Sequence, residues 1–206
     1  MAVLEVMALL DTRQDLDLCA LEMGCAVGQL LTPSSRHQLR DPARPWAIDN
    51  SAFAEFEPRV FDALLRREEY HKDKCLFVTT PDVVGSARRT LEVFERFKDR
   101  LAGWPLALAC QDGQHDLPIP WDDIRAVFIG GSTNFKCGEH ATHIIKAAKL
   151  LGKWVHVGRV NTPGRFQHFN ELGVDSIDGT GLAQYSHMRE AIGTTDQQID
   201  LEDYLA

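Results

Sequence analysis

The chain has 206 residues, enough for one domain with a substantial core and too few for two of ordinary size. Its 44% hydrophobic and 25% charged residues are typical of a soluble globular protein. A formal net charge of -8 argues against a protein that coats nucleic acid through bulk positive charge, although a local basic rim on an acidic body remains compatible with it.

Neither the cysteines nor the first residues indicate export. The five cysteines are dispersed, with no CxxC or CxC spacing, which argues against a disulfide framework and a cysteine-rich zinc site. No apolar run approaches membrane-spanning length, and Met1–Leu10 lacks a basic region and a cleavage site. We therefore expect a cytoplasmic protein with no membrane partner and no cofactor. We also expect no metal, because the helically spaced His140 and His143 lack a third ligand.

The predicted elements begin with a strand, a helix and a second strand. Ala2–Leu9 is apolar enough for a strand, although a helix is also compatible. Asp15–Met23 has helical spacing, and Gly24 provides a natural stop. Ala26–Leu31 is the second strand. These elements begin an alternation of strands and helices that continues along the chain.

A long loop then interrupts this alternation. Thr32–Pro45 contains three prolines and no helical pattern, and its length is typical of a functional or mobile loop. Pro45–Ile48 is a short third strand that ends in polar residues. Pro58–His71 is an amphipathic helix with proline in its first turn, and Cys75–Thr79 is the fourth strand.

The middle of the chain supplies three further strands and two helices. Ser86–Leu101 keeps apolar residues at helical period, and Pro105–Ala109 reads as the fifth strand. Ala126–Ile129 is the sixth strand. Glu139–Leu151 is a helix, and Trp154–Val157 is the seventh strand.

The last helix and strand complete the pattern. Thr162 and a following proline start a helix at Pro163–Leu172, and Gly173 leads into an eighth strand that ends at Asp178. Residues 185–206 are a weakly helical closing segment. Eight strands with helices between most of them predict one α/β domain, a small (β/α)8 TIM-like barrel over residues 1–206. A doubly wound sheet is the alternative, because no helix joins the second and third strands.

Polar residues follow the predicted strands, and in a parallel barrel all of these ends face one mouth. Two carboxylates at such a mouth suit reactions at an anomeric carbon, where one attacks the sugar and the other transfers a proton. Phe53 could stack on a flat base. The residues at the strand ends are Asp49, Asp82, Gln111, Gly130, Gly131, Gly158, Arg159 and Asp178.

Six segments in fixed order resemble those of a known family. They read DNSAF from Asp49, PDVV from Pro81, ACQDG from Ala109, FIGG from Phe128, VGRVNTP from Val157 and GVDSID from Gly173. The set resembles the tRNA-guanine transglycosylase family, with its DSGGF, its aspartate segment after the fourth strand, and its VQGG, IGGLAVGE and MGVGTP…GVDMFD motifs. The resemblance covers roughly Ala47–Gly181.

The resemblance implies an exchange of guanine for a 7-deazaguanine in a nucleic acid. Asp178 matches the nucleophile that forms a covalent glycosyl-enzyme, and Asp49 matches the general acid/base. The partners would be a polynucleotide and a free 7-deazaguanine base. The residues that match base-binding positions are Phe53, Asp82, Gln111, Gly130, Gly131 and Gly158.

The sequence also departs from the family. It has no counterpart of the zinc-binding CxCxxC segment, and Gly179-Thr180-Gly181-Leu182 replaces a proline-threonine-arginine run. Lys136 stands where the family has glutamate. These departures favour DNA over tRNA, as in shortened DNA 7-deazaguanine transglycosylases of phages and bacterial defence islands. A phage protein of this kind would act in the host cytoplasm.

Contact with DNA would require a basic rim and access to the base. A base inside a duplex must be flipped or exposed in a single strand, so a separate DNA-opening protein is a candidate partner. A homodimer is also compatible with the sequence. Arginines suit phosphate contact, although solubilising loop charge is an equal interpretation. The candidate rim residues are Arg36, Arg40, Arg44, Arg159, Arg165 and Lys136.

Two other functions remain open at this point. In a nucleosidase or N-glycosidase, water would replace the incoming base and free base would be released. A non-catalytic accessory subunit would bind the base at the same mouth without turnover. The paired Asp49 and Asp178 favour catalysis over the accessory role.

Overall fold

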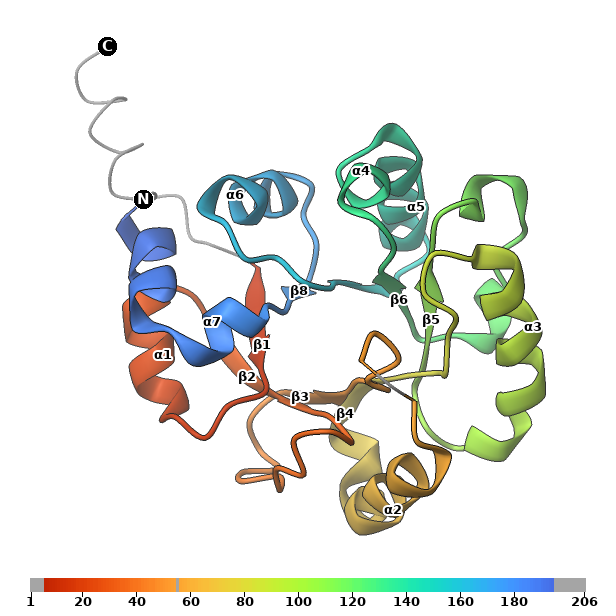
Figure 1. The fold of residues 1–206 in the computed structure, drawn as a ribbon, viewed down its shortest axis with the longest axis horizontal. Helices are drawn as coiled ribbons and strands as arrows, with labels where there is room; N and C mark the ends of the chain where they lie inside the picture. The colour runs from red at the N-terminus through yellow and green to blue at the C-terminus, as the bar shows by residue number, and fades with distance from the viewer. Residues whose placement is uncertain (1–5, 55, 195–206) are drawn as a thin grey trace.

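The computed structural model describes residues 6–54 and 56–194. Its centre is a closed barrel of eight parallel strands in the order β1 to β8, and β8 pairs with β1 through Met7 and Ala8. This closure confirms the predicted (β/α)8 barrel and excludes the doubly wound sheet. Figure 1 shows the helices arranged around the outside of the strands.

The first half of the barrel follows the predicted pattern closely. The side chain of Asp15 accepts hydrogen bonds from two backbone N–H groups and caps α1, and Gly24 ends that helix with φ 66°. No helix separates β2 from β3, as expected. The elements are β1 (Met7–Leu10), α1 (Leu16–Met23), β2 (Val27–Leu31), β3 (Trp46–Ile48), α2 (Pro58–Glu68), β4 (Cys75–Thr79) and α3 (Ala87–Phe97). The start of the strand predicted at Ala2–Leu9 lies outside the described residues.

Two predicted helices end more than one or two residues earlier than expected. The α-helix predicted to reach His71 ends at Glu68 and continues as a 3₁₀ helix, Glu69–Lys74. The helix predicted to reach Leu101 ends at Phe97 and is followed by a 3₁₀ turn. Such turns satisfy backbone groups that the last turn of an α-helix leaves free.

The second half adds two short helices that periodicity did not predict, α4 and α7. Ser132 caps α4 by accepting a hydrogen bond from the backbone N–H of Phe135 at 3.2 Å. The elements are β5 (Leu106–Cys110), 3₁₀ turns at Gln114–Asp116 and Trp121–Asp123, β6 (Ala126–Ile129), α4 (Thr133–Lys136), α5 (Glu139–Leu150), β7 (Trp154–Val157), α6 (Pro163–Glu171), β8 (Ser176–Ile177) and α7 (Thr180–Gln184).

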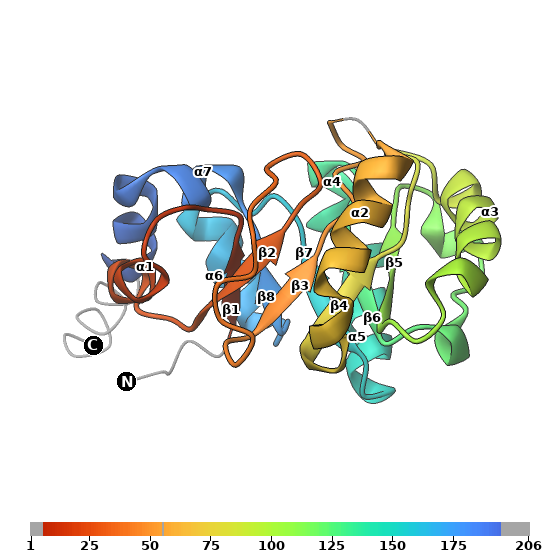
Figure 2. The same ribbon diagram turned by 90° about the horizontal axis from the view of Figure 1, so that it is seen from below.

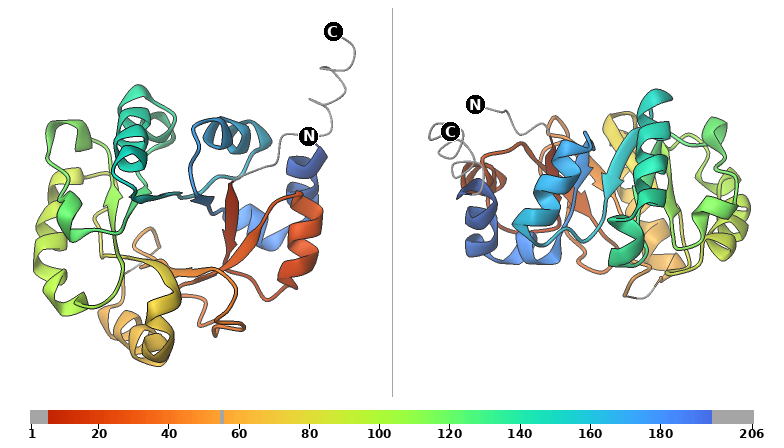
Figure 3. Two further views of the ribbon diagram at one scale, coloured as in Figure 1. Left: turned by 180° about the vertical axis from the view of Figure 1, so that it is seen from behind. Right: turned by 90° about the horizontal axis from the view of Figure 1, so that it is seen from above.

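The predicted closing segment is described up to Thr194, and residues 186–194 are helical. Arg189 fixes this helix to the barrel: its guanidinium is buried, pairs with Glu22 of α1, and donates to the carbonyl of Leu182 at 2.7 Å. Residues 195–206 of the predicted segment lie outside the described residues. Figure 2 shows α7 beside α1 in the side view, and Figure 3 shows the surrounding helices from behind and from above.

The core has two layers because strand side chains alternate in direction. Outward-facing residues pack under the helices, as Leu106, Leu108 and Cys110 of β5 do. A smaller inner layer fills the barrel. It consists of Leu9, Leu30, Ala47, Phe77, Ala107 and Ala126. This apolar inner layer lies below the carboxyl ends of the strands, where the polar residues of the barrel mouth gather.

Close strand packing at Gly28 provides a test of the barrel. A Cβ at this position would lie 2.5 Å from the carbonyl oxygen of Pro45 and 2.7 Å from Cδ2 of Leu9. We predict that Gly28→Ala lowers the free energy of unfolding by about 1–3 kcal/mol, because both neighbours must move. Gly164→Ala on α6, where a Cβ meets open space, should change it by less than about 1 kcal/mol. Urea unfolding of both variants measures the difference, and equal stabilities would contradict this packing.

Candidate active site

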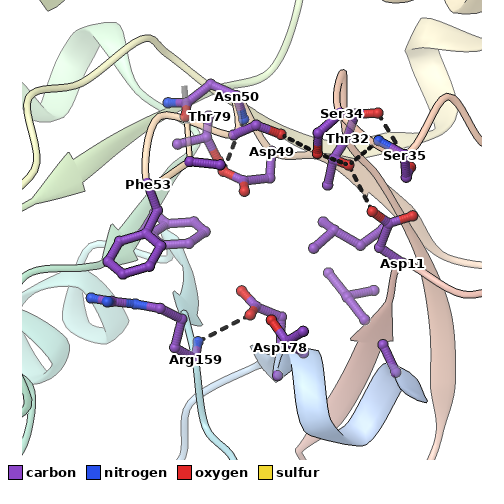
Figure 4. A pocket seen from close by; sticks show the side chains of 18 of the residues that line it. Asp11, Thr32, Ser34, Ser35, Asp49, Asn50, Phe53, Thr79, Arg159 and Asp178 are labelled. Atoms are coloured by element: carbon purple, nitrogen blue, oxygen red, sulfur yellow. Dashed lines mark hydrogen bonds between the residues drawn. The ribbon is translucent and has the colours of Figure 1, made fainter. Parts of the chain in front are cut away.

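A cavity of about 840 Å³ lies at the carboxyl ends of the strands. Leu9, Leu30 and Phe128 lie at its apolar base, and polar residues from the strand ends form its walls. Figure 4 shows Asp49 and Asp178 on opposite sides of this space. The mouth of the barrel therefore brings together the two carboxylates that the sequence singled out.

Asp178 is fixed by its position directly after the two-residue strand β8. Its backbone N–H donates to the carbonyl of Val157 at 3.1 Å, which continues the pairing with β7. Its carboxylate is held at both oxygens: the backbone N–H of Arg159 donates to Oδ1 at 3.0 Å, and Nε2 of His156 lies 2.9 Å from Oδ2. These contacts orient a carboxylate that lines the cavity.

His156 is a functional candidate that the sequence did not reveal beyond its place in a strand. It is fully buried between the rings of Phe77 and Phe128, at centroid distances of 5.0 and 4.8 Å. Its Nδ1 lies 2.9 Å from Oγ of Ser176, its register partner on β8. A polar residue at an inward-facing position of a buried strand is the one sequence signal that could have indicated it.

Asp49 follows β3 and is the second carboxylate of the pair. The backbone N–H of Asn50 donates to its Oδ1 at 2.8 Å. Burial, followed by the negative charges of Asp178 and Asp82, raises the pKa of Asp49 to about 7. A carboxyl group with this pKa can both give and take a proton near neutral pH.

Asp82 lies in a network of amide donors on the same side of the mouth. Nδ2 of Asn50 donates to Oδ1 at 2.8 Å, and Nε2 of Gln111 donates to Oδ2 at 2.5 Å. Burial raises the pKa of Asp82, although these two hydrogen bonds oppose the shift. Oε1 of Gln111 accepts from the backbone N–H of Gly85 at 3.0 Å, which fixes the amide orientation. Asp82 and Gln111 both line the cavity.

Phe53 and Arg159 approach each other at the mouth from the loops after β3 and β7. Phe53 is 66% exposed, and the guanidinium carbon of Arg159 lies 4.1 Å from the centroid of its ring. The same guanidinium donates to the carbonyl of Gly131. Figure 4 shows the two side chains facing each other. A flat ligand on this face of Phe53 would therefore take the place of Arg159.

The opposite wall is a polar cluster that the sequence interpretation did not include. Asp11 follows β1, and its two carboxylate oxygens contact Nδ1 of His37 and Oγ1 of Thr32, each at 2.6 Å. Ser34 lies 3.1 Å from Thr32, measured between hydroxyl oxygens, and links it to Ser51 at the same distance. Figure 4 shows Asp11, Thr32 and Ser34 across the cavity from Phe53.

The glycines at the mouth keep room for neighbouring side chains. A Cβ at Gly130 would lie 2.9 Å from Nε2 of Gln111, and one at Gly131, which has φ 71°, would lie 2.5 Å from Asp112. Gly130 and Gly131 line the cavity. Gly158 is not among the residues that line the cavity, and a Cβ there would lie 2.7 Å from the ring of Phe128, so its contact with a base stays a prediction.

The predicted basic rim is only partly present. Lys136 is buried, donates to the carbonyl of Gly158 at 2.5 Å, and has its pKa lowered to about 8, first by burial and then by Arg159. Its assignment to a polynucleotide-contacting rim is therefore wrong. Arg44 is also misplaced: its guanidinium pairs with Asp17 and the carbonyl of Val27, at the start of β2.

The remaining arginines differ in their contacts. Arg40 donates to the carbonyls of Gln14 and Thr12 at 2.7 and 3.1 Å, so it joins the loops after β1 and β2. Arg36 is exposed and Arg165 is half-buried. Of the six predicted rim residues, Arg159 is the one that lines the cavity. Arg13 also lines the cavity, although the sequence did not indicate it.

Within residues 6–54 and 56–194, no group of three or more His, Cys, Asp and Glu side chains is arranged to hold a metal ion. His140 stacks on His115 with ring centroids 4.0 Å apart, and His143 faces Glu139. None of the helices in this part of the chain has the length and apolar character needed to span a membrane.

Fold and site together define a (β/α)8 barrel with two facing carboxylates in a mouth cavity. No protein-family model and no curated protein matches the sequence. Solved structures that align with it include phosphoribosyl anthranilate isomerase from Thermus thermophilus, with 15% identity, 94% of this chain and 99% of that chain covered, and a TM-score of 0.47. A native KDPGal structure aligns with 16% identity, 94% of each chain covered and a TM-score of 0.45.

The raised pKa of Asp49 predicts a pH-dependent effect on stability. Between the unfolded pKa of 3.8 and about 7, the folded protein keeps a proton that the unfolded chain releases, so rising pH lowers wild-type stability. Asparagine carries no such proton. We predict that Asp49→Asn gains about 1–3 kcal/mol of unfolding free energy relative to wild type between pH 5 and pH 8. Urea unfolding at both pH values measures this, and a pH-independent difference would contradict it.

Proposed function

We propose that the protein is a base-exchanging transglycosylase that replaces guanine in a polynucleotide, with DNA favoured over tRNA, by a 7-deazaguanine. The observation that carries this proposal is the pairing of Asp178 and Asp49 across one cavity. Asp178 is held by the backbone N–H of Arg159 and by Nε2 of His156, whereas burial and neighbouring charge favour the protonated form of Asp49. Two carboxyl groups in such different environments suit a nucleophile and a general acid.

In the first half-reaction, an oxygen of Asp178 forms a bond to C1′ of the sugar. The bond from C1′ to N9 of guanine breaks, and its electron pair stays with the base. The protonated carboxyl of Asp49 gives its proton to the departing base. The products are a glycosyl ester on Asp178, free guanine and an ionised Asp49.

In the second half-reaction, the incoming 7-deazaguanine occupies the vacated space. Asp49 takes the proton from N9 of this base as N9 forms a bond to C1′. The ester bond from C1′ to Asp178 breaks, and the carboxylate is regenerated. Water in place of the incoming base would give hydrolysis, so exclusion of water decides between exchange and a nucleosidase reaction.

The base-binding side of the cavity is supported by the residues around Phe53. Asp82 and Gln111 present acceptors and donors that can pair with the edge of a guanine-like base. Phe53 supplies an aromatic face on which a base can stack, and the guanidinium of Arg159 occupies this face in the structure. Binding of a base would exchange the guanidinium for the base and release Arg159 toward the mouth.

The polymer is proposed from the sequence departures and from the two arginines that line the cavity, Arg13 and Arg159. Lys136, Arg40 and Arg44 do not line the cavity, so the cationic contacts to phosphate would come from Arg13 and Arg159, which would exchange their present contacts with His37 and the carbonyl of Gly131 for the phosphate. Such a small number of contacts fits binding of one flipped or single-stranded nucleotide better than binding along a duplex. The favoured substrate is therefore DNA opened by another protein.

Asp178 provides the direct test of this function. We predict that Asp178→Ala abolishes exchange of labelled guanine in a single-stranded DNA oligonucleotide, and that Asp178→Asn forms no covalent adduct. Asp116→Asn, whose side chain is 77% exposed, should retain wild-type exchange. Thermal unfolding of each variant shows whether it is folded.

The same assay separates the alternatives. Retained exchange in either Asp178 variant would refute the assignment. Release of free base by the wild type without an incoming base would indicate a nucleosidase, and exchange on RNA but not DNA would refute the choice of polymer. Exchange in intact duplex by the purified protein alone would exclude the need for a DNA-opening partner.

A second prediction concerns Phe53. Phe53→Ala should weaken binding of free 7-deazaguanine roughly ten- to a hundredfold, because stacking on an aromatic ring contributes about 1–3 kcal/mol per base. Phe53→Tyr keeps the ring and should bind within about threefold of wild type. Isothermal titration calorimetry measures both affinities. Equal affinity of Phe53→Ala and wild type would show that the base binds elsewhere.

A further inference from the structure

A buried histidine supports the carboxylate of Asp178 from the side of β7. The side chain of His156 is completely buried, and it is connected to the cavity by the 2.9 Å contact between its Nε2 and Oδ2 of Asp178. This order is the reverse of a hydrolase triad, where the imidazole faces the substrate and the carboxylate lies behind it. His156 can therefore affect a reaction only through Asp178.

The surrounding hydrogen bonds determine which ring nitrogen carries the hydrogen. Nε1 of Trp154 lies 2.8 Å from Oγ of Ser176, and an indole N–H can only donate, so this bond uses a lone pair of the serine. Among the hydrogen bonds of the described residues, Nδ1 of His156 at 2.9 Å is the one acceptor available to the hydroxyl hydrogen of Ser176, so we infer that the hydroxyl donates to it. Nδ1 is thus the acceptor. In the neutral ring, Nε2 then carries the hydrogen and donates it to Asp178.

We propose that His156 is the positioning residue of Asp178, acting as a neutral Nε2–H imidazole that orients the carboxylate. This inference rests on the proposed role of Asp178 as nucleophile. With His156 on Oδ2 and the backbone N–H of Arg159 on Oδ1, each oxygen keeps a lone pair for attack on the sugar. A neutral donor leaves the negative charge of the nucleophile intact, whereas an imidazolium would offset it.

The packing around the ring supports a fixed position. The rings of Phe77 and Phe128 lie 5.0 and 4.8 Å from the imidazole and exclude water from it. The ring is also held at both nitrogens, so rotation would break two hydrogen bonds. Trp154, Ser176 and His156 therefore donate in one direction, and the series ends at the accepting carboxylate of Asp178 in the cavity.

The tautomer can be measured in the resting protein without any substrate. Long-range ¹H–¹⁵N correlation spectra of protein labelled with ¹⁵N-histidine distinguish protonated from unprotonated ring nitrogens. The protein has eight histidines, and the signals missing in His156→Gln identify those of His156. We predict a neutral ring with hydrogen on Nε2 at pH 7.5. Hydrogen on Nδ1, or on both nitrogens, would overturn the proposal.

Two variants test the effect on catalysis. Glutamine can place its amide N–H near the position of Nε2, so His156→Gln should keep kcat for base exchange within about threefold of wild type. Leucine fills a similar volume without a donor, so His156→Leu should lose roughly ten- to a hundredfold in kcat, the effect of removing one hydrogen bond to a charged group. Wild-type kcat in His156→Leu, or equal losses in both folded variants, would overturn the positioning role.

These outcomes are distinct from a failure of the proposed function. If Asp178→Ala retained exchange, the function of Asp178 as nucleophile would fail whatever the tautomer of His156. If exchange required Asp178 but His156→Leu retained it, the inference about His156 alone would fail. KM for the oligonucleotide should change less than about threefold in His156→Leu, because His156 lies behind the carboxylate and does not face the bound base.

Discussion

The pairing of the short strand β8 with both β7 and β1 is the constraint on which the site depends. β8 contributes two residues, yet it closes the barrel and delivers Asp178 to the mouth. The same register places Ser176 beside His156, so the strand that ends in the carboxylate also orients its buried support. A slip of one residue would turn each of these side chains to the other face of the sheet. The same pairing of β8 therefore closes the barrel and sets the geometry of the site.

The two carboxyl groups lie in different environments, and this difference distinguishes their chemistry. Asp178 receives hydrogen bonds at both oxygens, whereas Asp49 is raised to a pKa of about 7 by burial and by the charges near it. Asp82 adds negative charge but is held by two amide donors. Burying these carboxyl groups lowers the free energy of unfolding, and a binding or catalytic role would explain why they are buried.

The fold was predictable because hydrophobic periodicity and turn residues specify the alternation of strands and helices. The bounds of Cys75–Thr79, Ala126–Ile129 and Trp154–Val157 agree with the sequence prediction. The helices α4 and α7 have four and five residues, too few for a periodic signal. Asp49 and Asp178 were found because strand ends converge in a parallel barrel. The position of His156 behind Asp178 depends on strand register. The positions of Lys136 and Arg44 depend on how long side chains pack, so hydrophobic periodicity did not predict any of the three positions.

We propose that Asp178 carries the sugar covalently during base exchange. Wild-type protein is incubated with a single-stranded oligonucleotide, quenched with acid during turnover, digested and analysed by mass spectrometry. We expect a peptide containing Asp178 that is heavier by the oligonucleotide lacking one guanine, and we expect the adduct to disappear when a 7-deazaguanine is added before the quench. Exchange that proceeds with no adduct, or with an adduct on Asp49, would contradict the mechanism.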